Sequence, residues 1–253
     1  MEGYNKREIL AILTAREIPD GSSVFVGIGI SQLAIELARM MGKRKLFSIY
    51  EGGTIDPFIK PNFMPFSTND IRVGYRALMY PSSIETFLYM QRGYVDLALM
   101  GAAQIDIHGN VNSSVLKGGG QVTRFPGSGG ANDLASLARQ TIIVTSLEKR
   151  RFVSTVDYIT SPGWLSGGNS RSSAGLRGGG PAMVITDKAI FRFDEKDRMM
   201  RLDAILEGVK VDDVLDNMGF TPLVSKDLGM LSPPSPDELR ALRGIDPGKV
   251  FIG

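Results

Sequence analysis

The stretch Phe47-Ser48-Ile49-Tyr50-Glu51-Gly52-Gly53 is the strongest single indication of the fold. Its apolar, β-prone residues predict a buried strand that ends in a carboxylate, and the two glycines predict a sharp turn directly after it. Glycine has no Cβ, so a ligand or another backbone segment can come close at this turn. Ligands of open α/β sheets bind at the carboxyl ends of the strands, which makes Glu51 a candidate for chemistry. The alternative is that Glu51 caps its loop or pairs with a Lys or Arg.

Similar apolar runs alternate with amphipathic segments along the first 150 residues. Because the runs are hydrophobic almost without interruption, they predict an α/β fold with a mainly parallel sheet flanked by helices. Asn5, with Glu8 three residues later, predicts the capped start of the first helix. The predicted strands cover residues 23–27, 47–50, 71–75, 95–100 and 141–145, and the predicted helices cover 6–18, 32–41, 82–93 and a short segment through Leu134 and Leu137.

From Lys149 onward the pattern is less regular. Residues 152–158 are β-like, and the long Gly/Ser loop over 161–181 is typical of a functional or mobile segment. A hairpin is predicted over 183–193 and helices over 211–218 and near the C-terminus. We predict one domain over residues 1–253 with an irregular C-terminal portion.

The composition excludes several kinds of site. A chain of 253 residues with a net charge of +2 and interspersed charges gives no reason to expect nucleic acid or a membrane surface. The absence of Cys excludes disulfides, thiolate metal sites and a cysteine nucleophile. No apolar signal segment and no run of 18 apolar residues occurs. We expect a cytoplasmic protein with no metal and no permanently bound cofactor.

The motif Gly27-Ile28-Gly29 stands between a predicted strand and a predicted helix. It lacks the third glycine of the dinucleotide fingerprint, and no acidic residue closes a second strand in the way that ribose binding needs. We therefore expect these glycines to serve close packing of the helix on the strand.

Three motifs, read together, resemble a known family. They are Glu51-Gly52-Gly53, the segment Gly101-Ala102-Ala103-Gln104-Ile105-Asp106 with Gly109-Asn110-Val111-Asn112, and Gly127-Ser128-Gly129-Gly130-Ala131-Asn132. This combination is similar to the β subunit of family I CoA-transferases, most closely the glutaconate CoA-transferase branch. The similarity continues through residues 148–152, 157–164, 186–188 and 245–248, and so covers nearly the whole chain.

The resemblance implies a two-subunit enzyme, with an α and a β subunit of CoA-transferase (NagB–RpiA-like) α/β fold and an active site at their interface. It implies that Glu51 is the catalytic glutamate, placed at the end of a strand. The branch motif is usually Glu-Ser-Gly, whereas this chain has Glu51-Gly52-Gly53. The nucleophile is kept and a hydroxyl is lost, which leaves the fine selection of substrate open.

Transfer of CoA between carboxylic acids, here expected to be dicarboxylic or oxo acids, needs no metal, redox cofactor or thiol, and CoA is itself a substrate. A carboxylate that is held in position and partly desolvated can attack a thioester, and the reaction then forms a glutamyl–CoA thioester. Backbone N–H groups hold the oxyanion, one donor being worth about 2.7–4 kcal/mol. We expect this surface in the loop of Gly127, Ser128, Gly129, Gly130, Ala131 and Asn132, with Gly129 and Gly130 as close-approach positions.

Other polar residues of the motifs have two possible roles each. Gln104 either donates to the substrate carbonyl or satisfies the backbone of its own loop. Arg150 and Arg151 are expected to attract a substrate carboxylate, the CoA phosphates or an acidic patch on the partner. We expect one of the two to face solvent.

For a further group, the structural role is the favoured one. Asn110 and Asn112 are expected to form turns, and His108 is expected to be a surface turn residue rather than a general base. Trp164 is expected either to anchor a subunit contact or to lie in the core.

An acyl-CoA hydrolase and a decarboxylase are alternative functions on the same fold. The resemblance implies that relatives with these activities lack the strand-end glutamate. A non-catalytic subunit of such a complex is a further alternative, and a sugar-phosphate isomerase is a remote one because no phosphate-specific cluster is evident.

Overall fold

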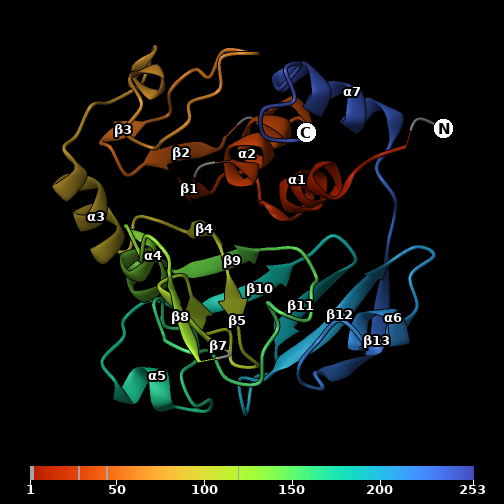
Figure 1. Ribbon diagram of the computed structural model, residues 1–253. Coiled ribbons are helices and arrows are strands. Elements are labelled where there is room, and N and C mark those ends of the chain that lie inside the picture. Colours follow the sequence, from red (N-terminus) through yellow and green to blue (C-terminus); the bar gives the residue numbers. More distant parts are fainter. Residues whose placement is uncertain (1–2, 28, 44, 119) are drawn as a thin grey trace. The chain divides into compact units, whose positions relative to one another are not determined.

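The computed structural model describes residues 3–27, 29–43, 45–118 and 120–253, so Ile28 of the Gly-x-Gly motif and Gly119 lie outside the described residues. The chain groups into two compact units (Figure 1). The first unit comprises residues 1–100 and 233–253, and the second comprises residues 101–232. The single domain over residues 1–253 stays a prediction.

The first unit is built on the strands β1 (Ser23–Val26), β2 (Phe47–Tyr50), β3 (Thr54–Ile55) and β4 (Leu97–Gly101). β1 pairs in parallel with both β2 and β4, and β3 returns antiparallel to β2. Val24, Phe25 and Val26 are buried, as expected for a central parallel strand that is covered on both faces. The strands predicted at 23–27, 47–50 and 95–100 are therefore confirmed.

The α-helices described in this unit are α1 (Lys6–Glu17), α2 (Ile30–Met40), α3 (Ser83–Gln91) and α7 (Pro236–Ile245). The capping box of Asn5 and Glu8 begins α1, as predicted. The strand predicted at 71–75 is wrong, because η1 (Ile71–Gly74) is a 3-10 helix. The Asp70 side chain accepts the N–H of Arg72 and begins a helical turn, in which Ile71 is 92% exposed while Val73 is buried, so the two apolar residues do not share one buried face as a strand would require.

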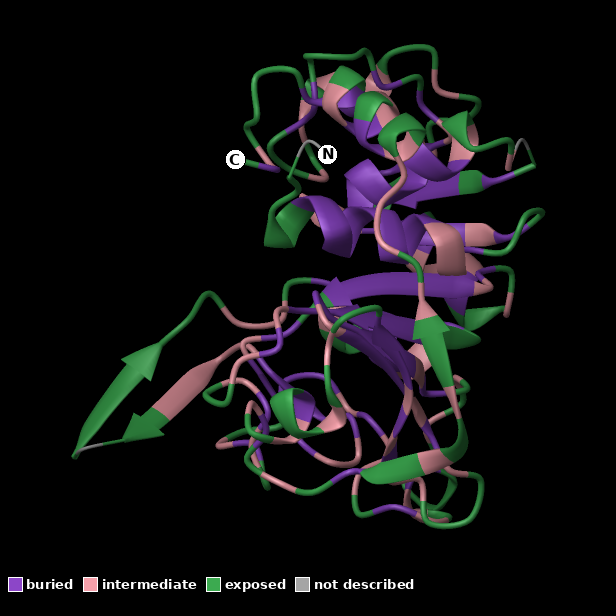
Figure 2. Cartoon of the chain, turned by 90° about the vertical axis from the view of Figure 1, so that its right-hand side faces the viewer, coloured by how far each residue is buried: buried purple, intermediate pink, exposed green. Residues whose placement is uncertain are grey.

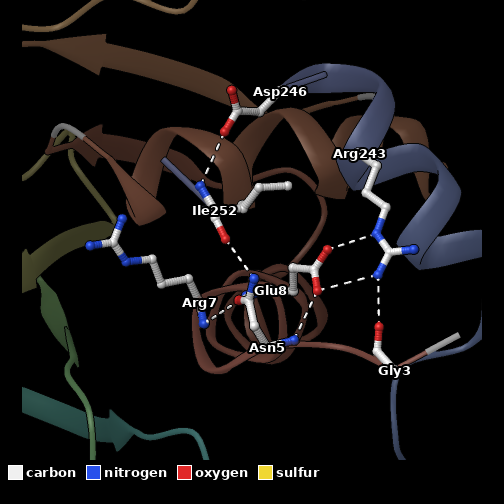
Figure 3. A network of polar contacts seen from close by, with 7 residues as sticks. All are labelled: Gly3, Asn5, Arg7, Glu8, Arg243, Asp246 and Ile252. Atoms are coloured by element: carbon white, nitrogen blue, oxygen red, sulfur yellow. Dashed lines mark hydrogen bonds and ion pairs between the residues drawn. The ribbon is translucent and has the colours of Figure 1, made fainter. Parts of the chain in front are cut away.

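The two ends of the chain are tied together in the first unit (Figure 3). Asn5 Nδ2 donates to Ile252 O at 2.6 Å, and Arg243 Nε donates to Glu8 Oε1 at 2.7 Å. Asp246 accepts backbone N–H groups of the C-terminal turn, including that of Ile252. Burial raises the pKa of Glu8, but the hydrogen bonds from Arg243 and from Asn5 N outweigh it and bring the pKa below its ordinary value. The C-terminal tail is thus part of the packing of α1.

The second unit contains the strands β9 (Gln140–Val144), β10 (Pro181–Ile185), β11 (Ala189–Phe193), β12 (Met200–Leu206) and β13 (Leu223–Leu231), in the order β13-β12-β11-β10-β9. The β9–β10 and β12–β13 pairs are parallel, and β11 is antiparallel to both of its neighbours. The hairpin predicted over 183–193 is confirmed, whereas β12 and β13 had no prediction. The helices of this unit are short: α4 (Ala131–Leu137), α5 (Ser170–Ser173) and α6 (Val211–Leu215).

The β-like segment predicted at 152–158 is wrong as a strand. Phe152 forms an isolated bridge with Ile105, and its carbonyl accepts the N–H of Gly219 at 2.6 Å. The N–H of Asp157 donates to the Gln104 side chain. Irregular partners therefore take the backbone groups that a sheet ladder would need.

Two small antiparallel sheets complete the second unit: β5 (Gln104–Ile105) with β6 (Val111–Asn112), and β7 (Val115–Gly118) with β8 (Gln121–Arg124). The β7–β8 hairpin extends away from the rest of the unit and is mostly exposed (Figure 2). Within the described residues, none of the helices has the length and hydrophobicity that crossing a membrane requires.

Candidate active site

Glu51 lies directly after β2, in the turn that leads into β3. A hydrogen bond of 3.0 Å from Gly53 N to Tyr50 O closes this turn, and Gly53 adopts a φ of +95°. Glu51 is half-buried, and its carboxylate forms no hydrogen bond or ion pair with any residue that the structure describes. The alternative of a capping or paired carboxylate therefore finds no support in the structure.

The turn of Glu51 shares its edge of the sheet with the start of α2. Phe25 of β1 pairs in parallel with Ile49, and continuing this register brings Gly27 level with Glu51. A Cβ on Gly27 would lie 3.3 Å from Leu99 O of β4, which is a close contact between strands, so the expected packing of the helix on the strand stays a prediction. At this edge α2 begins after Gly29 with no side-chain cap, so its first N–H groups are left for another acceptor.

The two glycines after Glu51 are required by their neighbours in the first unit. A Cβ on Gly52 would lie 2.6 Å from both Asn69 Oδ1 and Thr68 O, and a Cβ on Gly53 would lie 2.1 Å from Pro81 O. These distances are shorter than van der Waals contact, so another backbone segment makes the close approach that the glycines permit. The space that a serine at position 52 would need is filled by the segment around Asn69.

A charged cluster lies between α2 and β2. Arg39 pairs with Glu36 at 2.8 Å and with Asp56, and its Nη2 also donates to Ser48 Oγ at 3.0 Å. Burial raises the pKa of Glu36 to about 7, because the attraction of Arg39 only partly offsets the loss of solvation. Burial also raises the pKa of Tyr50, whose hydroxyl is without a hydrogen-bond partner among the described residues.

Gln104 is held in a polar network of the second unit. Its Oε1 accepts Asn112 Nδ2 at 2.6 Å and Asp157 N at 3.2 Å, and its Nε2 donates to Asp157 Oδ2 at 3.1 Å. Asn112 Oδ1 in turn accepts the N–H groups of Ser114 and Val115, which confirms its expected role as a turn former. These contacts favour the structural alternative for Gln104, and a contact with substrate stays a prediction.

The loop over 127–132 turns twice before α4. Gly127 and Gly129 adopt φ values of +99° and +48°, and nothing lies within 4 Å of the place that a Cβ would take on either. Within the described residues, the N–H groups of Gly129 and Gly130 donate no hydrogen bond. Asn132 Nδ2 donates to Thr160 O at 2.8 Å, and the Thr160 hydroxyl contacts Asn112 Oδ1 at 3.4 Å. The loop is thereby tied to the network of Gln104.

The two adjacent arginines both lie near Glu148 but differ in exposure. Arg150 has a side chain that is 76% exposed and pairs with Glu148 at 2.6 Å. Arg151 donates to Ala102 O at 2.9 Å and so lies against the loop that carries Gln104. The expectation that one of them faces solvent is confirmed, and that residue is Arg150.

The turn around His108 is held by a network of hydrogen bonds. Asp106 accepts the N–H groups of His108 and Asn110, and the Asn110 side chain bridges Asp106 to Leu165 O and to Gly163 N. Burial raises the pKa of Asp106, and the hydrogen bonds from Asn110 lower it only in part. The structural role expected of Asn110 is confirmed.

Comparison with known proteins identifies the family. The profile described as Coenzyme A transferase matches residues 7–217. The chain belongs to the coenzyme A transferase family.

Two relatives of this coenzyme A transferase family member are named as single components of larger enzymes. It is 38% identical to the B subunit of glutaconate CoA-transferase of Acidaminococcus fermentans, over 98% of this chain and 95% of the relative. It is 32% identical to the B subunit of 3-oxoadipate CoA-transferase of Pseudomonas knackmussii, over 97% of this chain and 95% of the relative. The prediction of a CoA-transferase is thereby confirmed.

Two solved structures have the same fold as this chain. The crystal structure of glutaconate coenzyme A-transferase from Acidaminococcus fermentans matches with a TM-score of 0.89 and 36% identity, over 99% of this chain and 98% of that chain. The decarboxylase AibA/AibB matches with a TM-score of 0.81 and 26% identity, over 98% of each chain. The predicted α/β fold class is confirmed.

The structure of this CoA-transferase family member arranges the candidate residues in two sets. Glu51 belongs to the first unit, while Gln104, the 127–132 loop and Arg151 belong to the second, where hydrogen bonds connect Gln104 to Asn132. Sequence reasoning missed the cluster of Arg39 and Glu36, for which helical spacing gave no separate signal. It also missed Asp157 and Thr160, which lie inside a quoted motif but whose partners are 28 to 53 residues away. Among the described residues, no group of three or more His, Asp or Glu could hold a metal ion.

Proposed function

We propose that this chain is the β subunit of a two-subunit CoA-transferase and that Glu51 is its nucleophile. The observation that carries the proposal is the position directly after β2 of a half-buried carboxylate that has no partner in the described part of the chain. Partial burial limits the solvation of the carboxylate, and the turn restricts its position, which are the two conditions for nucleophilic attack by a weak base.

The proposed reaction has four steps, each a nucleophilic substitution at a carbonyl carbon. A Glu51 carboxylate oxygen attacks the thioester carbon, the C–S bond breaks, and CoA leaves as thiolate from an acyl–glutamyl anhydride. The thiolate attacks the Glu51 Cδ, the first carboxylic acid leaves as carboxylate, and an enzyme–CoA thioester remains. The acceptor carboxylate then displaces CoA from Cδ, and CoA attacks the acceptor acyl carbon to regenerate Glu51. No net proton or electron is consumed.

The loop of Gly127 to Asn132 is proposed to hold the oxyanions or part of CoA. Support comes from the N–H groups of Gly129 and Gly130, which donate no hydrogen bond within the described residues, and from the open space beside Gly129. Arg151 is tied to Ala102 O, so we propose that it positions the loop of Gln104 and that Arg150 meets an anionic group of a substrate or partner. The proposed substrates are acyl-CoA and dicarboxylic or oxo acids, since the relatives are named for glutaconate and 3-oxoadipate.

The proposed partner is an α subunit, because each of the two relatives is named as the B subunit of its enzyme. An exposed apolar segment in the first unit supports a protein partner. Ile71 is 92% exposed, Leu78 is 62% exposed and Phe63 is 57% exposed, which is unusual for large side chains that stay in water. We also propose a cytoplasmic location, which agrees with the absence of Cys from the sequence.

Decarboxylation is the alternative that the similarity to AibA/AibB raises. Several solved forms of that decarboxylase are variants of a cysteine of that protein, whereas this chain has no Cys. No residue of this chain specifically favours decarboxylation, so CoA transfer is the function that we propose.

The test is chemical trapping of the thioester on Glu51. The chain is purified with its partner, incubated with a panel of acyl-CoAs and treated with borohydride, and the modified peptide is mapped by mass spectrometry. We expect a reduced residue at Glu51 that depends on the acyl-CoA and is absent in Glu51→Gln. Glu207→Gln, an exposed glutamate outside the site, is the matched control and keeps the adduct. Turnover of an acyl-CoA with no mark at Glu51 would overturn the mechanism.

A further inference from the structure

A cavity of about 460 Å³ opens in the second unit. Its lining includes Trp164 and the arginines Arg192, Arg198 and Arg201, together with Glu195. The volume is in the range of small-molecule sites, which is roughly 300–1,000 Å³. No residue proposed above for CoA transfer lines it.

One wall of the cavity is Trp164, which packs against Gly180. Trp164 Nε1 donates to Pro181 O at 3.1 Å. Gly180 adopts a φ of +79°, and a Cβ there would lie 3.1 Å from the indole ring. Gly178 and Gly179 pack just as closely, since their Cβ atoms would lie 2.5 Å from Ala138 O and 2.0 Å from Arg139 O. Gly180 therefore makes room for the tryptophan, while Gly178 and Gly179 make room for the backbone around Ala138 and Arg139.

Arg198 is held over this tryptophan in an unusual conformation. Its backbone φ is +55°, in the left-handed region that non-glycine residues avoid, and its guanidinium lies 4.4 Å from the Trp164 ring centre. His108 Nδ1 donates to Arg198 O at 3.1 Å, and Asp194 accepts three backbone N–H groups of the same loop. Strained residues persist where the surroundings fix them, and they are frequent at ligand sites. The single His of the chain thus helps to present Arg198.

The side chains that line the cavity carry a net positive charge. Arg192 and Arg201 share the carboxylate of Asp203, at 3.0 and 3.1 Å. The guanidinium of Arg198 donates no hydrogen bond to a described residue, and stacking on Trp164 leaves the N–H groups at its edge available. Glu195 is the acidic side chain of the lining, and Asp203 lies outside it. The lining therefore carries three guanidinium groups and one carboxylate, while Asp203 and Asp194 act on these arginines from outside the lining.

We propose that this cavity binds a phosphate group of an anionic ligand, with Arg198 as its main donor. A guanidinium presents paired N–H donors that match phosphate oxygens, and cation–π contact orients it before the ligand arrives. The phosphates of CoA and the phosphate of a free metabolite share this chemistry. The proposal concerns binding in the second unit and does not rest on the nucleophilic role of Glu51.

Isothermal titration of the full chain with inorganic phosphate, CoA and dephospho-CoA tests the proposal. The variant is Arg198→Asn, because Asn tolerates the left-handed conformation and preserves the loop. The control is Lys196→Asn, which removes the same charge from an exposed position of the loop that does not line the cavity. We expect Arg198→Asn to weaken binding by about tenfold or more, as for one charge-assisted hydrogen bond, and Lys196→Asn by less than about twofold.

A variant that gains affinity distinguishes an effect on binding from an effect on folding. Glu195→Gln removes a negative charge from the cavity and is expected to tighten binding of the same ligand by about threefold or more. If Arg198→Asn loses more affinity for CoA than for dephospho-CoA, the site is assigned to the 3′-phosphate of CoA. If its loss of affinity for inorganic phosphate equals its loss for CoA, the site is assigned to a free phosphate. Absence of binding by all three, or equal affinities of Arg198→Asn and Lys196→Asn, overturns the proposal whether or not Glu51 forms an adduct.

Discussion

At the scale of single residues, the charged side chains between α2 and β2 pair with one another and leave Glu51 without a partner among the described residues. Arg39 is occupied by Glu36, Asp56 and Ser48. Glu51 lies beyond the end of β2, where the turn exposes part of it to solvent. Charge at this site is therefore distributed so that the structural carboxylates are paired and the proposed nucleophile is not.

Replacement of Gly52 by Ser tests the fit of the turn. The new Cβ would meet Thr68 O and Asn69 Oδ1 at 2.6 Å, so the segment around Asn69 must shift. We expect a loss of about 1–3 kcal/mol in the free energy of unfolding, measured by urea titration. Gly3→Ser is the control, since nothing lies within 4 Å of a Cβ there. Equal stability of Gly52→Ser and the parent chain would show that the neighbouring segment yields without cost.

The raised pKa of Glu36 predicts a pH-dependent stability. The folded chain holds the proton up to about pH 7, whereas the unfolded chain releases it near the ordinary value of 4.5. Stability from this group is therefore complete below pH 4.5 and is lost as the pH rises toward 7, by roughly 3 kcal/mol at most. We expect the melting temperature of Glu36→Gln to fall less than that of the parent between pH 5 and pH 8 (about the window of this shift).

Thermal melting at several pH values checks this, with the exposed Glu207→Gln as control. Parallel pH profiles of Glu36→Gln and the parent chain would mean that Glu36 stays ionised in the folded chain.

At the scale of elements, the long loop over 161–181 is anchored by one buried arginine. Arg171 lies in α5, is 2% exposed and donates to Gly163 O at 2.8 Å, Ala135 O at 2.6 Å and Gly178 O at 3.0 Å. Burial lowers the pKa of Arg171 to about 10, which leaves it charged at neutral pH. One guanidinium thereby joins both ends of the loop to α4.

Replacement of Arg171 by Met removes these donors and leaves several buried carbonyls unpaired. We expect a loss of about 3 kcal/mol or more, because each buried acceptor costs about 1–3 kcal/mol when left unsatisfied. Hydrogen exchange followed by mass spectrometry is expected to show faster exchange in 161–180 and in α4. Arg177→Met, an exposed arginine of the same loop, is expected to exchange like the parent chain. Unchanged protection in Arg171→Met would assign the anchoring to Asn110 instead.

At the scale of the whole molecule, the exposed apolar side chains of the first unit are consistent with the proposed partner. Cations stack on several of the aromatic rings of this segment: Lys60 lies 5.0 Å from the Tyr75 ring centre, and Arg72 lies 4.8 Å from that of Phe66. Mixed apolar and cationic surfaces of this kind suit burial against a protein.

Charges placed on this surface should prevent assembly and leave the chain itself intact. Ile71 and Leu78 are 92% and 62% exposed, so Ile71→Glu and Leu78→Glu remove no core contact. We expect the double variant to lose its partner in co-purification and size-exclusion chromatography, with a melting temperature of the isolated chain like that of the parent. Met230→Glu, on an exposed side chain of β13, serves as the control. Retention of the partner by the double variant would place the subunit contact on another surface.

The sequence by itself determined the family and those elements that depend on interactions between residues close in the chain. The capping box of Asn5, the buried strand before Glu51 and the hairpin over 183–193 follow from local pattern, because capping and alternation act over a few residues. The motifs around Glu51 and Gly127–Asn132 identified the coenzyme A transferase family for the same reason, since each motif is contiguous.

Only the tertiary structure decided which residues meet across long separations. Examples are the pairing of β12 with β13, the packing of Trp164 against Gly180, the hydrogen bond from Arg171 to Ala135 and the engagement of Gln104 by Asp157, which join positions up to 53 residues apart. The strand predicted at 71–75 failed because apolar composition does not reveal an exposed surface. Such contacts depend on the packing of the whole chain, and local propensity carries no information about it.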